Sequence, residues 1–239
     1  MSGHPLDNPA RTALLGPHSH LAQRHGRVLR YPSDVSPFVG IPDDPDEHDW
    51  RELASALGPG EPAPIPGVHA GLPEGWEVLI DIPGVQMVDA RAPEAAVAPD
   101  PGAVALSSVD VPEMLALVAR TEPGPFLPRT IEMGDYLGIR RGGKLVAMAG
   151  ERLHPPGWTE ISAVCTDPAY RGQGLASRLV CAVAAGIRRR GETPFLHAAA
   201  SNVTAIRLYE SLGFRLRRDV PFRAVRVPAG LLLEEGASR

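Results

Sequence analysis

The sequence is poor in the features that mark secreted, membrane-spanning and zinc-binding proteins. It has only two cysteines among 239 residues, Cys165 and Cys181, and neither lies in a CxxC pair or a His/Cys cluster with zinc-like spacing. No run of about 18 apolar residues exists, and the N-terminal segment MSGHPLDNPARTALLG lacks the apolar core of a secretory signal. We therefore expect a soluble cytoplasmic protein with free thiols and no membrane partner.

Metal and nucleic-acid binding are also poorly supported. His18, His20 and His25 cluster near the N-terminus, but they lack acidic or further histidine partners at ligand spacing, so no metal site is predicted. The basic segment GIRRRGE at residues 186–192 has no aromatic stacking partners. It lies at the end of an expected helix, where arginines complement the helix dipole. We therefore expect no nucleic-acid partner.

Proline usage divides the chain into two parts. Of the 26 prolines, 20 precede residue 129, and the segments 42–49 and 58–67 are typical of loops. We expect a loop-rich N-terminal region over residues 1–102, in the manner of a degenerate α/β half. A second domain is expected over residues 103–239. Hydrophobic residues make up 44% of the chain, which is enough for a packed core.

Clear secondary-structure signals begin near residue 103. Strands that form a hairpin meander come before strands that alternate with helices, which indicates an α/β fold with a mixed, mostly antiparallel sheet flanked by helices. The elements expected here are a strand at 103–109, a helix at 111–121, a hairpin at 136–153, a strand at 159–166, a helix at 175–190, a strand at 194–200, a helix at 202–213 and two last strands at 214–220 and 222–228. In the first part, a helix is expected at 48–57 and a strand at 76–82.

The segment DPAYRGQGLA at residues 167–176 lies between an expected strand and a long expected helix. Gly172 and Gly174 allow a phosphate to approach the first turn of that helix, where N–H groups are unpaired, and Arg171 adds a charged donor. The segment is neither the dinucleotide fingerprint GxGxxG nor a P-loop, because the third glycine and a Gly-Lys-Ser/Thr are missing. Taken alone, a tight turn is the simpler interpretation.

Two motifs together change that interpretation. Residues 171–176 fit the pattern Arg/Gln-x-x-Gly-x-Gly/Ala and follow ISAVCTDPAY, and SNVTAIRLYESLGF occupies residues 201–214. This combination resembles the GNAT acetyltransferase superfamily, and within it the FR47-like bacterial proteins, over about residues 103–227. The resemblance implies binding of acetyl-coenzyme A (acetyl-CoA) as an acyl donor.

The resemblance also assigns coenzyme-binding residues. The strand before the loop is expected to splay from its neighbour and to pair with the pantetheine arm through its backbone. The loop is expected to hold the pyrophosphate, with alanine in place of the glycine that is common at its last position. The residues so assigned are Val164, Cys165, Thr166, Arg171, Gly172, Gln173, Gly174, Leu175, Ala176, Ser177 and Asn202.

Two residues are expected to be catalytic. Tyr209 lies seven residues after Asn202, so both share one helix face, and the resemblance implies that Tyr209 protonates the leaving thiolate. A packing role is the alternative. Glu160 is expected to take the proton of the acceptor amine, with Glu151 as second candidate and His197 as third.

The sequence therefore predicts an N-acetyltransferase that moves an acetyl group to a primary amine of a small molecule, amino acid or peptide. Direct attack in a ternary complex is expected, and no histidine partner that would make Cys165 a nucleophile is visible. An acyl-CoA-binding sensor or scaffold without turnover stays open, as does transfer of another acyl group. Residues 1–102 are expected to shape the acceptor pocket or the surface of a homodimer.

Overall fold

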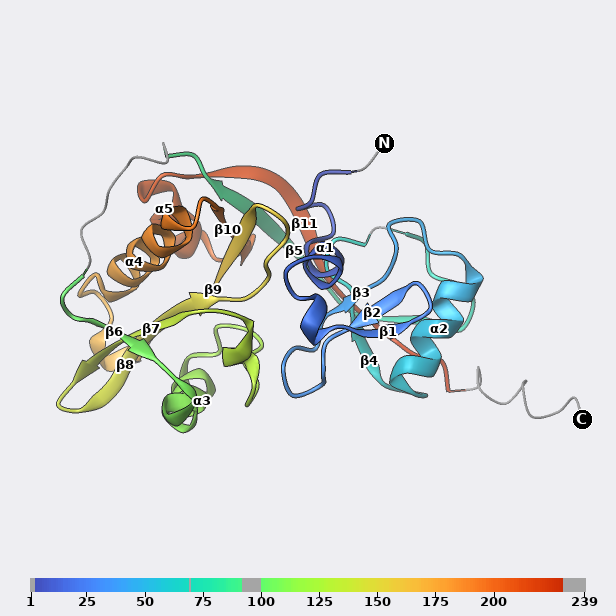
Figure 1. Ribbon diagram of the computed structural model, residues 1–239, viewed down its shortest axis with the longest axis horizontal. Helices are drawn as coiled ribbons and strands as arrows, with labels where there is room; N and C mark the ends of the chain where they lie inside the picture. Colours follow the sequence, from blue (N-terminus) through green and yellow to red (C-terminus); the bar gives the residue numbers. More distant parts are fainter. Residues whose placement is uncertain (1–2, 69, 92–99, 230–239) are drawn as a thin grey trace, which may run out of the picture.

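The computed structural model describes residues 3–68, 70–91 and 100–229. These residues form a three-stranded sheet and an eight-stranded sheet with helices packed against it (Figure 1). The helices and 3-10 turns are α1 (Pro9–Leu15), η1 (Ser19–Leu21), α2 (Glu47–Leu57), η2 (Ser108–Asp110), α3 (Val111–Thr121), η3 (Thr130–Met133), η4 (Pro168–Tyr170), α4 (Leu175–Arg189) and α5 (Val203–Ser211). The strands are β1 (Gln23–His25), β2 (Val28–Arg30), β3 (Val39–Gly40), β4 (Pro62–Pro64), β5 (Glu77–Asp89), β6 (Ala103–Leu106), β7 (Tyr136–Arg141), β8 (Lys144–Glu151), β9 (Trp158–Thr166), β10 (Thr193–Ala199) and β11 (Phe214–Arg226).

The larger sheet has the strand order β4-β11-β5-β10-β9-β8-β7-β6. All neighbouring strands run antiparallel except β9 and β10, which are parallel and joined through α4. A parallel pair needs such a crossover, whereas the antiparallel pairs use turns such as Gly142–Gly143 between β7 and β8. The expected mixed, mostly antiparallel sheet flanked by helices is confirmed.

One face of the sheet is covered by α4 and α5, which lie together in Figure 1. Leu179, Val183 and Ile187 recur every four residues along α4 and are buried against the sheet. They meet Met87 of β5 and Leu196 of β10 in one apolar cluster. Each buried side chain of this size contributes about 1.5–3 kcal/mol, so this cluster fixes the start of α4 beside the end of β9.

The opposite face is shared by two other groups of elements. Met114 and Leu117 of α3 pack against Met148 of β8 and Cys165 of β9. The N-terminal segment packs against the same face further along, where Tyr31 joins a cluster with Phe195 of β10. The first part of the chain is therefore in direct contact with the strands that carry the predicted site.

The strand expected at 76–82 extends to Asp89 and becomes β5, which lies between β10 and β11. It pairs with β10 from Gly84 to Val88 and with β11 along its whole length. Figure 1 shows β5 and β11 running side by side between the N-terminal elements and the helices α4 and α5. The larger sheet thus contains strands from both sides of the division expected at residues 102 and 103. The division into two domains stays a prediction.

The last two expected strands form a single strand, β11, so their separation at Pro221 is wrong. Pro221 lies opposite Pro83 of β5. The carbonyl of Pro83 accepts from Ala200 N on the β10 side, and the carbonyl of Arg223 accepts from Ile65 N on the β4 side. Because groups on one edge of a strand recur every two residues, both prolines face away from the β5–β11 ladder, which loses no hydrogen bond.

Candidate active site

The parallel pair β9 and β10 separates in the middle of the sheet. Pairing runs from Trp158 and Thr193 to Ile161 and Leu196, and no register partner follows in the described residues, although both strands continue. The cause lies in β9, where Ala163 has a φ of 53° and the register with β8 shifts between Met148 and Gly150. A bulge of this kind re-aims a strand. We call the diverging segments, residues 162–166 and 197–199, the splay.

The loop predicted to hold an anion lies at the far end of the splay. Asp167 accepts a hydrogen bond from Ala169 N and so orders the turn that leaves β9. Gly172 and Gly174 have φ angles of 76° and 70°, and a Cβ atom at either position would meet nothing within 4 Å. Gly174 is the N-cap of α4 and supplies no side-chain cap, so the first N–H groups of α4 remain available to an anion.

The residues of this loop differ in their exposure to solvent. Arg171, Gly172, Gln173 and Gly174 are exposed, Ala176 and Ser177 are half-buried, and Leu175 is buried in the core. Arg171 Nε lies 3.4 Å from the carbonyl oxygen of Thr166, which directs the guanidinium along the end of β9. Leu175 therefore anchors the helix, while the glycines leave the backbone open.

The residues of β9 expected to meet pantetheine differ in orientation. Val164 and Thr166 are half-buried, and Val164 packs towards the α4 face. Cys165 points the other way into the α3 cluster, where burial raises the pKa of its thiol. Only the main chain of Cys165 is thus presented to the splay, and its thiol is not placed to act as a nucleophile.

Helix α5 brings two predicted residues to the end of β10. Asn202 is its N-cap and accepts a hydrogen bond from Ala205 N at 3.1 Å. Tyr209 packs in the cluster that holds Leu196 and Ala198 of β10. Its hydroxyl has no hydrogen-bond partner in the described part of the chain, and burial raises the pKa of Tyr209 to about 12. The phenol thus keeps its proton at neutral pH.

Glu160 is completely buried beside the point where β9 and β10 separate. Its oxygens accept two hydrogen bonds from Arg152, at 2.7 and 2.8 Å. A third hydrogen bond joins Oε1 to His197 Nδ1, at 2.7 Å. Burial alone would raise the pKa of this carboxyl, but the charge and hydrogen bonds of Arg152, with the hydrogen bond to His197, hold it well below its usual range. Glu160 is therefore ionised and has all but one of its acceptor positions in use.

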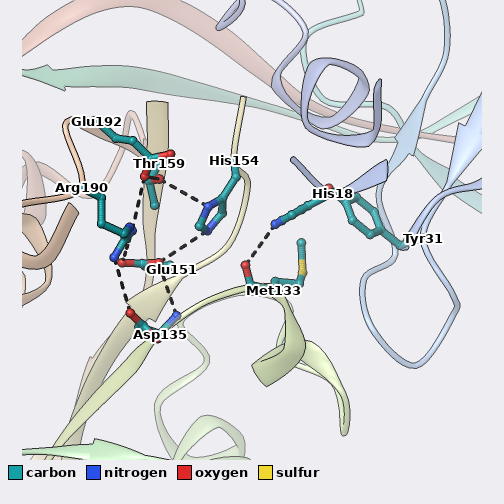
Figure 2. A network of polar contacts seen from close by, with 9 residues as sticks. All are labelled: His18, Tyr31, Met133, Asp135, Glu151, His154, Thr159, Arg190 and Glu192. Carbon is teal, nitrogen blue, oxygen red and sulfur yellow. Dashed lines mark hydrogen bonds and ion pairs between the residues drawn. The ribbon is translucent and has the colours of Figure 1, made fainter. Parts of the chain in front are cut away.

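Glu151, the second candidate base, belongs to a different cluster, drawn in Figure 2. It accepts from Arg190 at 2.8 Å and from Asp135 N at 3.3 Å, and His154 Nε2 lies 3.6 Å away. Burial raises the pKa of Glu151, and Arg190 opposes that shift. The figure shows its carboxylate directed at Arg190 and Asp135.

The same figure shows a junction centred on His18, where the N-terminal segment meets η3, which holds Met133, and the connection between β8 and β9, which holds His154. His18 Nδ1 lies 2.9 Å from the Tyr31 hydroxyl and Nε2 lies 3.1 Å from the carbonyl oxygen of Met133. Its ring lies 4.8 Å from that of His154. The sequence predicts no metal site at His18 and gives no sign of this junction, because Met133 and His154 are distant from His18 in the chain. No group of metal-ligating side chains occurs in residues 3–68, 70–91 and 100–229.

We expect this junction to make folding sensitive to acid. Burial lowers the pKa of His18 to about 3, and burial with the charge of Arg190 lowers the pKa of His154 to about 4. Both lie below the unfolded value of about 6.5, so the unfolded chain binds more protons and stability falls as the pH drops below that value. At pH 5 each of the two histidines should lower the free energy of unfolding by about 2 kcal/mol relative to its value at neutral pH.

Urea unfolding at several pH values between 7 and 5 measures this effect. His18→Gln should reduce the slope of unfolding free energy against pH by about half, since one of the two histidines is removed. His48→Gln is the matched control, because His48 is exposed on α2. An unchanged slope in His18→Gln would contradict the assignment of the acid sensitivity to the buried His18.

Comparison with known proteins places this geometry in a family. Residues 136–223 match the model of the FR47-like proteins. A solved GNAT-family structure from Novosphingobium aromaticivorans is 42% identical, with a TM-score of 0.85, over 93% of this chain and 98% of that one. The ribosomal protein bS18-alanine N-acetyltransferase of Escherichia coli K12 is 31% identical over 46% of this chain and 77% of its own length. The chain belongs to the GNAT acetyltransferase family.

Other relatives are matched over a shorter part of their length. The N-alpha-acetyltransferase RimI of Mycobacterium tuberculosis is 39% identical over 34% of this chain. The mycothiol acetyltransferase of Brachybacterium faecium is 36% identical over 38% of it. The chain spans 51% and 29% of the lengths of these two proteins. Within the described ranges, no helix is both long and apolar enough to cross a membrane.

Proposed function

We propose that the protein is an acetyl-CoA-dependent N-acetyltransferase. The observation that carries this proposal is the splay of β9 and β10, which ends at an open glycine loop and the N-terminus of α4. The free edge of β9 suits the amides of pantetheine, which can pair with a strand. The loop suits the pyrophosphate of the coenzyme. The residues proposed to hold acetyl-CoA are Val164, Cys165, Thr166, Arg171, Gly172, Gln173, Gly174, Leu175, Ala176, Ser177 and Asn202.

The proposed acceptor is a primary amine of a small molecule, amino acid or peptide. The relatives support an amine, because two are named N-acetyltransferases, one of them for the alanine of a ribosomal protein. Direct attack within a ternary complex is proposed, since the Cys165 thiol points into the α3 cluster. A cytoplasmic location and a homodimer stay predictions from the sequence.

The proposed reaction uses Tyr209 as the acid. The neutral amine nitrogen attacks the thioester carbonyl carbon, the C–N bond forms and the C–S bond breaks. The leaving thiolate takes the phenolic proton of Tyr209, and the surplus proton of the nitrogen passes to Glu160. The unpartnered hydroxyl of Tyr209 beside β10 supports its part in this scheme.

Glu160 remains the proposed proton acceptor, and its contacts define what that role requires. The carboxylate is ionised, as a base has to be, but it is buried and bound by Arg152 and His197. A proton can reach it only if one of these contacts yields to the amine or to a bridging water molecule. Glu151 is the second candidate, and its Arg190 contact sets the same requirement.

Replacing Tyr209 by phenylalanine tests the chemical step. We expect kcat to fall on the order of 100-fold, the usual contribution of a general acid, with little change in affinity for coenzyme A. Steady-state kinetics at saturating acetyl-CoA, with calorimetry for binding, measures both. Tyr136→Phe is the control, because the Tyr136 hydroxyl is buried and without a partner in the α3 cluster. Equal turnover of Tyr209→Phe and wild type would exclude Tyr209 as the acid.

Two alternatives make different predictions. A sensor or scaffold would bind acetyl-CoA but acetylate no amine in a broad panel. A transferase for another acyl group would turn over succinyl-CoA or a similar donor faster than acetyl-CoA. Competition between donors at equal concentration separates the second alternative from acetyl transfer.

A further inference from the structure

A continuous line of polar contacts joins the N-terminal segment to the splay. We call it the polar chain. Arg217 donates to Asp7 at 2.6 Å and to Gln86 at 2.7 Å, Gln86 Nε2 lies 3.0 Å from His197 Nε2, and His197 Nδ1 lies 2.7 Å from Glu160. Gln86 and Glu160 have no exposed surface, and the His197 side chain is 10% exposed. The members of the polar chain are Asp7, Arg217, Gln86, His197 and Glu160.

The contacts of Gln86 fix which way its amide points. Arg217 Nη1 can only donate, so the atom it meets is the amide oxygen of Gln86. The amide nitrogen then donates one hydrogen to the carbonyl oxygen of Leu6, at 2.8 Å. Its second hydrogen is directed at His197 Nε2. Turning the amide over would break both the Arg217 and the Leu6 contacts.

The orientation of Gln86 in turn fixes the imidazole of His197. Nε2 faces a donor, so it has to be the acceptor nitrogen of the ring. The ring proton is then on Nδ1, where it is donated to Glu160 Oε1. The opposite tautomer would place two donors against each other at Nε2 and a lone pair against a carboxylate at Nδ1.

The polar chain ends at the point where β9 and β10 separate. His197 is the first residue of β10 after its last pair with β9, Leu196 with Ile161, and it lies directly opposite Gln86 of β5. Phe195 and Phe222 hold the imidazole edge-on, with ring centroids 5.6 and 6.2 Å away. Asp7, Leu6 and Gln86 all precede the segment that matches the family model.

We propose that Gln86 and Arg217 are positioning residues of the active site. They hold His197 with its proton on Nδ1, and His197 in turn keeps the Glu160 carboxylate ionised and fixed in position at the base of the splay. This inference rests on the proposed function for the role of Glu160. In this proposal, strand β5 and the N-terminal segment, which both lie outside the family match, set the charge and position of the Glu160 carboxylate.

Other charged and titratable groups face the same cluster. Arg152 binds Glu160 from the far side and lies over the Phe38 ring at 4.8 Å. The charges of Glu160 and Arg152 also act on the phenols of Tyr31 and Tyr136, whose pKa values burial raises. Arg218 donates to Asp7 at 2.9 Å.

Nitrogen-15 NMR of the histidine rings tests the proposal directly on the intact protein. At pH 7 we expect His197, assigned from its missing signals in His197→Asn, to show a protonated Nδ1 and an unprotonated Nε2. In Gln86→Glu a carboxylate would face Nε2, so both ring nitrogens should be protonated. A wild-type His197 with its proton on Nε2 would overturn the proposal, whatever the variants do.

Kinetics tests the link to the reaction. Gln86→Glu should lower kcat about tenfold or more while the affinity for coenzyme A changes less than about threefold. Gln86→Met removes the donor without adding charge and should lower kcat less. This second variant also keeps the proposal testable if Gln86→Glu does not fold. Gln23→Glu, on an exposed residue of β1, is the matched control.

The outcomes separate this inference from the proposed function. Equal kcat in wild type, Gln86→Met and Gln86→Glu would overturn the positioning role. A wild type that acetylates no amine would contradict the proposed function and with it the catalytic part of the inference. The ring-nitrogen spectrum would still decide the tautomer of His197.

Discussion

Replacing Gly174 by glutamate is expected to abolish binding of coenzyme A. The new carboxylate would stand at the N-terminus of α4, where the pyrophosphate is proposed to lie. Two like charges about 4 Å apart repel by about 4 kcal/mol at an effective dielectric constant near 20, so the dissociation constant should rise at least 100-fold or so. Isothermal titration calorimetry with coenzyme A measures this change.

The chain supplies a matched control for that substitution. Gly143, in the turn between β7 and β8, also has a positive φ, 80°, and open space around its missing Cβ. Gly143→Glu therefore introduces the same charge and comparable backbone strain away from the loop. We expect it to bind coenzyme A as the wild type does. Unchanged affinity in Gly174→Glu would remove residues 171–176 as the pyrophosphate site.

Replacing Arg152 by methionine should have the largest effect on stability. Arg152 is 14% exposed and makes two hydrogen bonds to Glu160, which is completely buried. Removing one partner of a buried ion pair leaves an uncompensated charge and costs about 3–5 kcal/mol. Urea unfolding at pH 7 should show a loss of that size in the free energy of unfolding.

A double variant distinguishes the lost pair from a lost packing contact. Arg152→Met combined with Glu160→Leu removes both charges, so it should recover much of the stability lost in the single variant. Arg51→Met is the control, because its pair with Glu47 is exposed and such pairs contribute about 0–1 kcal/mol. If Arg152→Met lost less than about 1 kcal/mol, the Glu160 contact would not be the buried ion pair described above.

Local patterns in the sequence predict the loop and its flanking elements well. The glycines at 172 and 174 require positive φ angles, and the apolar spacing after them predicts α4, whose buried face carries Leu179, Val183 and Ile187. These features depend on neighbours within a few residues. The strands β7 to β10 and the helices α4 and α5 also follow from this part of the chain, and they lie within the residues that match the family model.

Contacts between distant segments could not be predicted in the same way. Nothing in the sequence of residues 77–89 says that β5 lies between β10 and β11. The surroundings of Glu160 illustrate the limit, because His197 is 37 residues from Glu160 in the chain, and Gln86 is 111 residues from His197. A glutamate at the start of a strand carries no sign in the sequence that arginine and histidine side chains will enclose it.

The most direct test of the central claim is transfer of a labelled acetyl group. The intact protein is incubated with deuterated acetyl-CoA and a panel of small amines, amino acids and peptides, and products are detected by mass spectrometry. We predict a labelled amide on at least one primary amine, with one free coenzyme A thiol released for each amide formed, and no product with Gly174→Glu. Tight binding of coenzyme A by the wild type without acetylation of any amine would contradict the account.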